Sequence, residues 1–341
     1  MPELLLRRPL VVSGSRLERV DNDVALGTAS GAGTLDDAVL LPGLVDLHTH
    51  VFSGQDLGVS ADEAAERSGV TAMVDAGSAG GDLFGAFAAI ALRSRTRLRA
   101  FVNISSIGTT SIQRRGELRS PEYLDEELVV RTIAEHPGLA VGVKVRASAN
   151  VGGRFTTRAL AAARRAADRA AAPLMVHLGP KPASIDTIVR TLGAGDIVTH
   201  CFTGFAGNSL IENGRIRPSV RRARERGVLF DVGHGVSGFD PAIARAAIDQ
   251  GFPPDTISTD LHAYSTHAAV DLPTVIGRIV AAGMPWADAL QAATRTPALA
   301  VGLDGAGILS FDSPCDVVVA RIAGSALTVE HCVRDAVLVR R

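Results

Sequence analysis

The sequence has few cysteines and none of the arrangements in which cysteine determines a fold. Cys201, Cys315 and Cys332 lie far apart in the chain. They form no Cys-x-x-Cys pair, and an odd, scattered set predicts neither a disulfide framework nor a cysteine metal site. We therefore expect a protein of the reducing cytoplasm.

Long apolar runs and an excess of charge are also missing. No stretch of about 18 apolar residues occurs, so no membrane span is expected, and the N-terminal residues lack the pattern of a signal peptide. The 35 basic and 36 acidic residues give a formal net charge of −1. That balance argues against nucleic acid or an anionic membrane surface as a partner.

The middle of the chain alternates strand-like and helix-like stretches. With 341 residues, of which 46% are hydrophobic, the chain can bury a large core. Such alternation over roughly 250 residues is typical of a (β/α)₈ barrel of the α/β class. An open, doubly wound sheet is the alternative, but no Gly-x-Gly-x-x-Gly follows the first strand. The apolar runs that we expect to be the eight strands are residues 40–47, 70–75, 98–103, 139–145, 174–177, 197–200, 228–232 and 256–259.

Both ends of the chain are rich in short strand-like runs separated by turn residues. We expect the two ends to form one small β-sheet domain, residues 1–40 and 304–341, beside a barrel of residues 41–303. The runs are residues 4–6, 10–12 and 23–26 near the N-terminus and 307–309, 316–320 and 336–339 near the C-terminus.

Residues that can bind metal lie at the ends of the expected strands, where (β/α)₈ barrels carry out their chemistry. Residues two apart in a strand point to the same side, so the histidines of a His-x-His pair can converge on one ion. Each residue alone has an ordinary explanation: a buried histidine, a lysine paired with a carboxylate, or a helix-capping aspartate. Their shared position predicts a metal site. The residues are His48, His50, Lys144, His177, His200 and Asp260, whereas His136, His267 and His331 do not fit the pattern.

The order His-x-His, Lys, His, His, Asp resembles the amidohydrolase superfamily of metal-dependent hydrolases. The most specific likeness is the phrase Leu-Pro-Gly-Leu-Val-Asp-Leu-His-Thr-His at residues 41–50. Residues 143–146, 199–204 and 230–235 resemble the deacetylase-like branch of that superfamily, which is related to dihydroorotase.

The resemblance implies two divalent metal ions, most often Zn²⁺. His48, His50 and Asp260 would bind the more buried ion, and His177 and His200 the other. A carboxylated Lys144 would bridge both ions, since a protonated amine cannot donate an electron pair to a metal, and burial favours the neutral amine that carboxylation needs. A mononuclear site with unmodified Lys144 is the alternative.

The expected reaction is hydrolysis of an amide or ester bond by a metal-bound hydroxide. Asp260 would act as general base and then as general acid towards the leaving group. We expect a small-molecule substrate, an acylated carboxylic acid such as an N-acyl amino acid, and a homo-oligomeric enzyme. A hydrolase of cyclic amides, imides or lactones is the alternative, and a non-catalytic assembly partner is a third possibility.

Four further residues are candidates for substrate binding. Arg146 lies two residues beyond Lys144 and could hold a carboxylate, although pairing with a neighbouring acidic residue explains it equally well. His234, between two glycines, could donate to the substrate or be a structural loop residue. Asn103, and Tyr264 with His262, follow the third and eighth expected strands.

Overall fold

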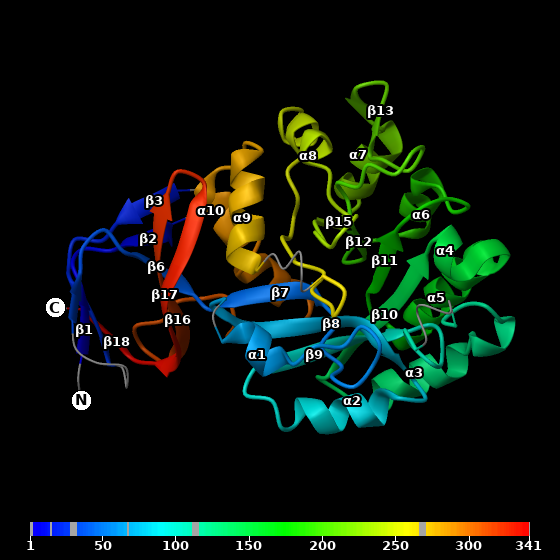
Figure 1. Cartoon of the computed structure of the whole chain (residues 1–341), viewed down its shortest axis with the longest axis horizontal. Coiled ribbons are helices and arrows are strands. Elements are labelled where there is room, and N and C mark those ends of the chain that lie inside the picture. Colours follow the sequence, from blue (N-terminus) through cyan, green and yellow to red (C-terminus); the bar gives the residue numbers. More distant parts are fainter. Residues whose placement is uncertain are drawn as a thin grey trace.

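Seven parallel strands form the central sheet of the computed structural model, which describes residues 3–13, 16–27, 33–66, 68–110, 116–265 and 271–340 (Figure 1). Neighbours along the sheet are also consecutive parallel strands in the chain, as the predicted barrel requires. In chain order the strands are β7 (Leu44–Thr49), β8 (Val70–Gly80), β9 (Arg97–Asn103), β10 (Ala140–Ala147), β11 (Leu174–Leu178), β12 (Ile197–Thr199) and β15 (Leu229–Asp231).

The eighth expected strand, residues 256–259, is not a regular strand, and that prediction of its local structure is wrong. The segment nevertheless joins the two edges of the sheet. Thr256 forms a parallel bridge with Asp231 of β15, and Leu261 forms one with Thr49 of β7. Backbone hydrogen bonds continue the contact on both sides, including one of 2.7 Å from the Asp260 amide to the carbonyl of His48. The sheet therefore curls into the predicted (β/α)₈ barrel.

Two buried carboxylates hold this irregular segment. Asp46 of β7 accepts hydrogen bonds from the amide and the hydroxyl of Thr259, at 3.0 and 2.6 Å. Asp231 of β15 accepts from the hydroxyls of Thr256 and Ser258, each at 2.7 Å at its shortest. Side-chain hydrogen bonds thus replace part of the missing backbone ladder at the closure of the barrel.

The helices surround the sheet because their apolar residues recur on one face. In α5, Ala159, Ala163 and Ala166 are buried at three- and four-residue spacing, which is the period of one helix side. Aspartates cap several helix starts, as Asp240 does for α8. The helices are α1 (Ala61–Ala65), α2 (Phe84–Ala91), α3 (Glu126–Glu135), α4 (Ala149–Gly152), α5 (Thr156–Ala170), α6 (Ile185–Thr191), α7 (Pro218–Glu225), α8 (Pro241–Ile248), α9 (Leu272–Ala281), α10 (Trp286–Gln291) and α11 (Arg295–Ala300), with 3₁₀ turns η2 (Pro121–Tyr123) and η3 (Gly153–Phe155) and a small hairpin, β13 (Ile211–Glu212) and β14 (Arg215–Ile216).

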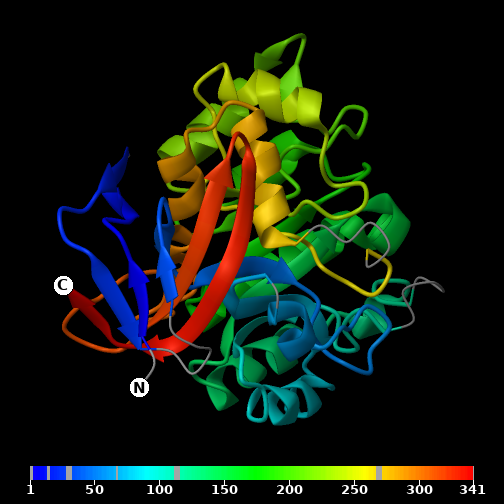
Figure 2. The ribbon, with the colours of Figure 1, turned by 60° about the vertical axis from the view of Figure 1, so that its left-hand side comes forward.

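The two ends of the chain together form a pair of sheets beside the barrel (Figure 2). The strand predicted at residues 307–309 is not formed; Gly307 has a left-handed φ of 67°, which an extended strand cannot accommodate. One sheet has the order β18 (Leu338–Arg340), β4 (Val24–Gly27), β1 (Glu3–Leu6), β5 (Gly33–Leu35), and the other the order β17 (Ala326–Ala336), β16 (Cys315–Ala323), β6 (Val39–Pro42), β2 (Leu10–Ser13), β3 (Arg16–Arg19).

Gly43 separates the terminal sheet from the barrel. The single strand expected at residues 40–47 is two strands, because β6 pairs with β16 in the terminal sheet whereas β7 enters the barrel. A Cβ atom at Gly43 would overlap the side chain of Thr71 and lie 2.8 Å from Cβ of Asp316. The close passage of the backbone at this point requires glycine.

The division into two domains at the expected boundaries, residues 1–40 with 304–341 and residues 41–303, stays a prediction.

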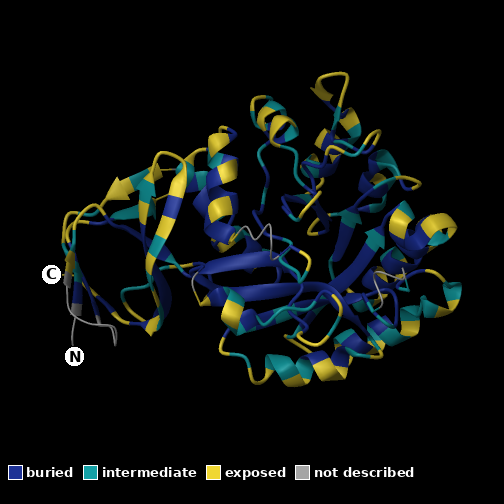
Figure 3. Ribbon diagram, in the orientation of Figure 1, coloured by how far each residue is buried: buried dark blue, intermediate teal, exposed yellow. Residues whose placement is uncertain are grey.

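The barrel strands are buried on both sides (Figure 3). All eleven residues of β8 are buried, as expected for a parallel strand covered by helices. Val45, Val74 and Phe101 belong to the cluster that fills the barrel, and residues of α11 and the following loop close that cluster at one end. In the described part of the chain, no helix is long and apolar enough to span a bilayer.

Replacing Gly43 with Ala should lower the free energy of unfolding by about 1–3 kcal/mol, because the added methyl group overpacks a buried contact. Gly85→Ala is the matched control, since Gly85 lies in α2 with open space around its Cβ position. That change should be neutral or stabilising by up to about 1 kcal/mol. Urea unfolding of both variants measures the difference, and equal stability of the two would contradict the assigned role of Gly43.

Candidate active site

The His-x-His pair at the end of β7 is buried at the mouth of the barrel. His48 and His50 are 1% and 4% exposed, and their ring centroids are 5.6 Å apart. His50 Nδ1 lies 2.8 Å from the hydroxyl oxygen of Ser78 in β8. His48 contacts the opposite side of the barrel, where its Nδ1 lies 2.6 Å from the hydroxyl oxygen of Thr199 in β12.

Neighbouring acceptors determine which ring nitrogen of His48 and of His200 carries the proton. The Thr199 hydroxyl donates its hydrogen to Asp231 at 2.7 Å, so it must accept from His48 Nδ1–H. His200 Nδ1 lies 2.5 Å from the carbonyl oxygen of Gly233, which can only accept. Burial lowers the pKa of His48 well below its usual value and that of His200 to about 4, so both rings are neutral. Each Nε2 therefore presents a lone pair.

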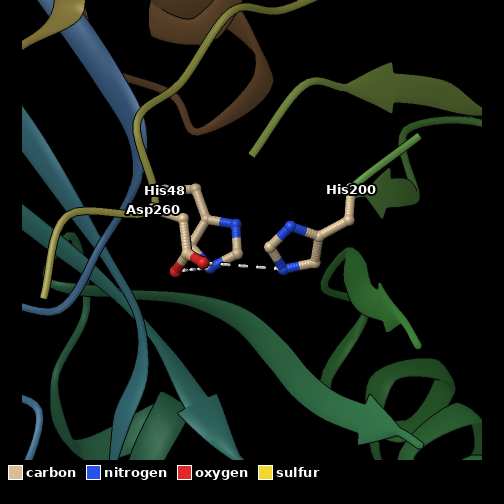
Figure 4. A group of neighbouring side chains, drawn as sticks. All are labelled: His48, His200 and Asp260. Carbon is tan, nitrogen blue, oxygen red and sulfur yellow. Dashed lines mark ion pairs between the residues drawn. The ribbon is translucent and has the colours of Figure 1, made fainter. Parts of the chain in front are cut away.

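Asp260 brings its carboxylate to these lone pairs. Oδ1 lies 3.2 Å from His48 Nε2, and Oδ2 lies 3.9 Å from His200 Nε2 (Figure 4). Oδ1 also lies 3.4 Å from His50 Nε2. Both Asp260 and His200 have left-handed backbones, with φ of 52° and 65°. Non-glycine residues adopt that conformation at a cost of about 1–3 kcal/mol, and such strain is concentrated at functional sites.

Lys144 lies at the inner side of the cluster. Its Nζ is 3.4 Å from His48 Nε2 and 3.4 Å from the sulfur of Met175, and the residue is 1% exposed. Burial lowers the pKa of the Lys144 ammonium to about 8. Gly77 makes room for this side chain: its φ is 80°, and a Cβ atom there would lie 2.6 Å from Cβ of Lys144.

His177 lies at the end of β11, beside His200. Their ring centroids are 4.4 Å apart and the rings are nearly perpendicular. The structure thus places all six expected metal-binding residues at one end of the barrel. The tightest group is His48, His200 and Asp260, whose ligand atoms lie within 4.8 Å of one another.

Two of the expected substrate-binding residues are held by a buried glutamate that the sequence analysis missed. Glu117, 1% exposed, accepts a hydrogen bond of 2.9 Å from Arg146 Nη1 and another of 2.9 Å from the amide of Asn103. Asn103 also donates to the carbonyl of Gly77, so both hydrogens of its amide are used inside the protein. Arg146 has the carboxylate partner that we considered as its alternative explanation.

His234 is also engaged on both sides of its ring. Arg278 Nη1 donates to Nε2 at 2.6 Å, and Nδ1 lies 2.9 Å from the carbonyl oxygen of Gly235. Its ring therefore has no free N–H to offer a substrate. His262 differs, because its Nδ1 accepts from the backbone amide of Tyr264. The proton of the neutral His262 ring is then on Nε2, where it can be donated.

The remaining residues lie at the rim or beyond the described part of the chain. His262 is half-buried, with its ring 6.2 Å from that of His50, and Tyr264 is 46% exposed. His267 lies outside the described residues.

Thr199 and Asp231 were not among the residues expected at the site. Asp231 is the last residue of the mostly buried strand β15, a strand-end position like that of the expected site residues, and that signal could have found it.

Comparison with known proteins agrees with this geometry. The sequence model of the Amidohydrolase family matches residues 39–326. The chain belongs to the amidohydrolase family.

Two named proteins of similar sequence and one of similar structure make the comparison more specific. Deacetylase Atu3266 of Agrobacterium fabrum is 37% identical over 285 residues, covering 83% of this chain and 70% of that protein. A deacetylase of Brucella anthropi is 35% identical over the same length, covering 83% and 71%. A crystal structure of a dihydroorotase superimposes with a TM-score of 0.84 at 30% identity, covering 100% of this chain and 99% of that one. The resemblance inferred from the sequence is confirmed, both for the family and for the barrel fold.

The donor set of this amidohydrolase fits a divalent metal ion. Neutral imidazoles and a carboxylate are the ligands that zinc and similar ions take. His200 Nε2 is buried and has no hydrogen-bond partner among the described residues. An unpartnered buried lone pair is unfavourable unless a ligand fills the space beside it.

Thr199→Val should weaken metal binding by about 10- to 100-fold, because it removes the acceptor that orients His48. Thr132→Val is the matched control: its buried hydroxyl donates to the carbonyl of Leu128 within α3, away from the site. Competition with a chromogenic chelator gives the metal affinity, and thermal unfolding reports the common cost of a lost hydroxyl. An unchanged affinity in the Thr199 variant would show that the threonine does not position the histidine.

Proposed function

We propose that this amidohydrolase is a metal-dependent hydrolase that removes the acyl group from a small acylated carboxylic acid, such as an N-acyl amino acid. The observation that carries the proposal is the convergence of His48, His200 and Asp260, with two imidazole lone pairs aimed at one carboxylate. The similarity to two deacetylases over most of the chain supports the acyl class.

The histidines and Asp260 at this end of the barrel would hold two divalent ions, and the histidine-rich donor set suits Zn²⁺. His48, His50 and Asp260 are assigned to one ion, and His177 and His200 to the other. Divalent ions held by these residues would polarise the scissile carbonyl as Lewis acids and would lower the pKa of a water molecule. The edge-to-face contact of His177 with His200 brings the second pair within reach of the first group.

Asp260 is assigned the proton transfers. Its two carboxylate oxygens face different histidines, so the group spans the cluster. In this position it can accept a proton from the attacking water and deliver it to the departing amine or alkoxide. Glycine at position 235 leaves room for this carboxylate, since a Cβ atom there would be 2.5 Å from Oδ2.

Lys144 is assigned the bridge, as a carbamate. With a pKa near 8, about a tenth of the amine is neutral at pH 7. The ammonium first loses one proton, and the neutral nitrogen then forms a bond to the carbon of carbon dioxide and releases a second proton to water. The two steps together convert a cation into an anion with two oxygen donors. The position of Nζ, 3.4 Å from His48 Nε2, directs those oxygens into the metal cluster.

Substrate contacts are assigned to the rim. His262 can donate from Nε2 to a substrate oxygen, and Tyr264 lies beside it. Arg146 uses one of its five guanidinium donors on Glu117, so it remains our candidate for a carboxylate near the metal cluster. The structure does not favour Asn103 or His234 for this role, because their donors are used within the protein.

A cyclic amide or imide is the second candidate substrate. The superposition with a dihydroorotase over the whole chain supports it, and the same group of histidines and carboxylate suits either bond. A screen of N-acetyl amino acids of both hands, acetylated hydroxy acids and cyclic imides distinguishes the two classes. Acetate release supports the deacetylase, ring opening alone supports the second candidate, and the absence of both metal and activity supports a non-catalytic assembly partner.

Asp260→Asn should lower kcat by about 10²–10⁴-fold while most of the metal stays bound, because the amide keeps an oxygen donor but cannot take up a proton. Asp312→Asn, in an exposed turn of the terminal region, is the control and should leave kcat unchanged. Elemental analysis and steady-state kinetics give the two quantities. Substantial turnover by the Asp260 variant would exclude it as the general base.

Metal loading should depend on carbon dioxide. Protein stripped of metal and reconstituted with Zn²⁺ in bicarbonate buffer should take up about two ions per chain, and about one in buffer freed of carbon dioxide. Lys144→Met, which preserves an unbranched apolar stem, should remove this difference. Two ions per chain without carbon dioxide would contradict the carbamate and leave the unmodified lysine as the correct description.

A further inference from the structure

A pocket between α8 and α9 lies apart from the metal cluster. Its volume is about 590 Å³, within the usual range for small-molecule sites. Arg245 Nη1 of α8 lies 3.4 Å from the carbonyl oxygen of Ala281 in α9, so the two helices meet beside it. The lining residues are His234, Val236, Phe239, Pro241, Arg245, Arg278, Ala281 and Ala282, and none of them is an expected metal ligand.

The two arginines of this pocket differ in their surroundings. Arg245 pairs with Asp249 one turn further along α8. Arg278 donates to His234 Nε2, a neutral acceptor, and forms no ion pair with any carboxylate of the described residues. Its positive charge is therefore uncompensated on the pocket wall, and its other N–H groups can bind a planar anion in a bidentate manner.

Apart from the two arginines and His234, the wall is apolar. The ring of Phe239 stacks on that of His234, with centroids 4.7 Å apart and an angle of 25° between planes. Val236 is 63% exposed at the rim, and Pro241, Ala281 and Ala282 add aliphatic surface. One guanidinium without an ion pair, that of Arg278, among such groups suits a ligand that has one anionic end and an apolar body.

We propose that the pocket between α8 and α9 is a binding site for a small carboxylate that carries an apolar group, with Arg278 as the residue that recognises the carboxylate. The guanidinium pairs with the two carboxylate oxygens, and the apolar group lies against Phe239 and Val236.

His234 connects this pocket to the metal cluster. The loop that carries it has Gly233, whose carbonyl accepts from His200 Nδ1, on one side and Gly235, which lies against Asp260, on the other. A carboxylate that draws the Arg278 guanidinium away weakens the 2.6 Å contact with His234 Nε2. Occupancy of the pocket is thereby coupled to the segment that positions two residues of the candidate active site.

Binding of 3-phenylpropionate to the purified full-length, metal-loaded protein tests the proposal. In ligand-observed NMR titration, the wild-type protein should bind it saturably, and at least 10-fold more tightly than either acetate or 3-phenylpropanol. Arg278→Gln should weaken that binding at least 10-fold. Arg190→Gln, an exposed arginine of α6, is the control and should leave it unchanged.

A second variant covers the case in which Arg278→Gln does not fold. Val236→Asp places a negative charge at the exposed rim and should weaken 3-phenylpropionate binding at least 10-fold, whereas Val236→Asn should retain most of it. Equal binding by wild type and Arg278→Gln, or no saturable binding, would overturn the proposal; the first result would place the carboxylate on the metal ions instead.

Kinetics of the metal-loaded enzyme then identify the source of the carboxylate. If 3-phenylpropionate inhibits the enzyme competitively and Arg278→Gln abolishes that inhibition, the pocket binds the part of the substrate that lies away from the scissile bond. A change in kcat without competition assigns it to an independent effector. Both results support the site, and the binding measurement stands even if the proposed hydrolysis fails.

Discussion

The irregular segment that closes the barrel depends on two buried carboxylates. Asp46 and Asp231 belong to the two edge strands and hold Thr259, Thr256 and Ser258 between them. Burial raises the pKa of both, to about 7 for Asp46, and their hydrogen bonds oppose that shift. A charge excluded from water is stable only when its acceptors are satisfied, so closure of the barrel and satisfaction of these two groups require one another.

The same carboxylates connect the fold to the candidate chemistry. Asp231 also accepts from Thr199, which thereby becomes an acceptor for His48. One buried charge therefore closes the sheet and exposes the His48 Nε2 lone pair. Asp260, which has a left-handed backbone, follows directly after the segment that they hold.

The sequence predicted a residue's position in the fold where that position depends on residues close to it in the chain. Apolar runs located the seven regular strands, and each strand-end histidine could be recognised from the two or three residues before it. Glu117 could not be found in this way, because it lies in a loop and meets Arg146 only through the fold. Likewise, nothing near His234 in sequence indicates Arg278, 44 residues later, as its partner. The failed eighth strand has the same origin: side-chain hydrogen bonds from distant strands replaced the regular ladder that its composition predicted.

The loop after β15 has two chemically different sides. Towards the barrel it consists of glycines, because His200 and Asp260 leave no room for a Cβ atom: at Gly233 one would lie 3.0 Å from His200 Nδ1, and at Gly235 one would lie 2.5 Å from Asp260. Away from the barrel it carries His234, Val236 and Phe239, which line the pocket between α8 and α9. Because Gly233 and Gly235 are packed against the barrel residues and flank His234 directly, a shift of His234 displaces them as well. We therefore expect a ligand that changes the contact between Arg278 and His234 to alter the surroundings of Asp260, the residue to which the proton transfers are assigned.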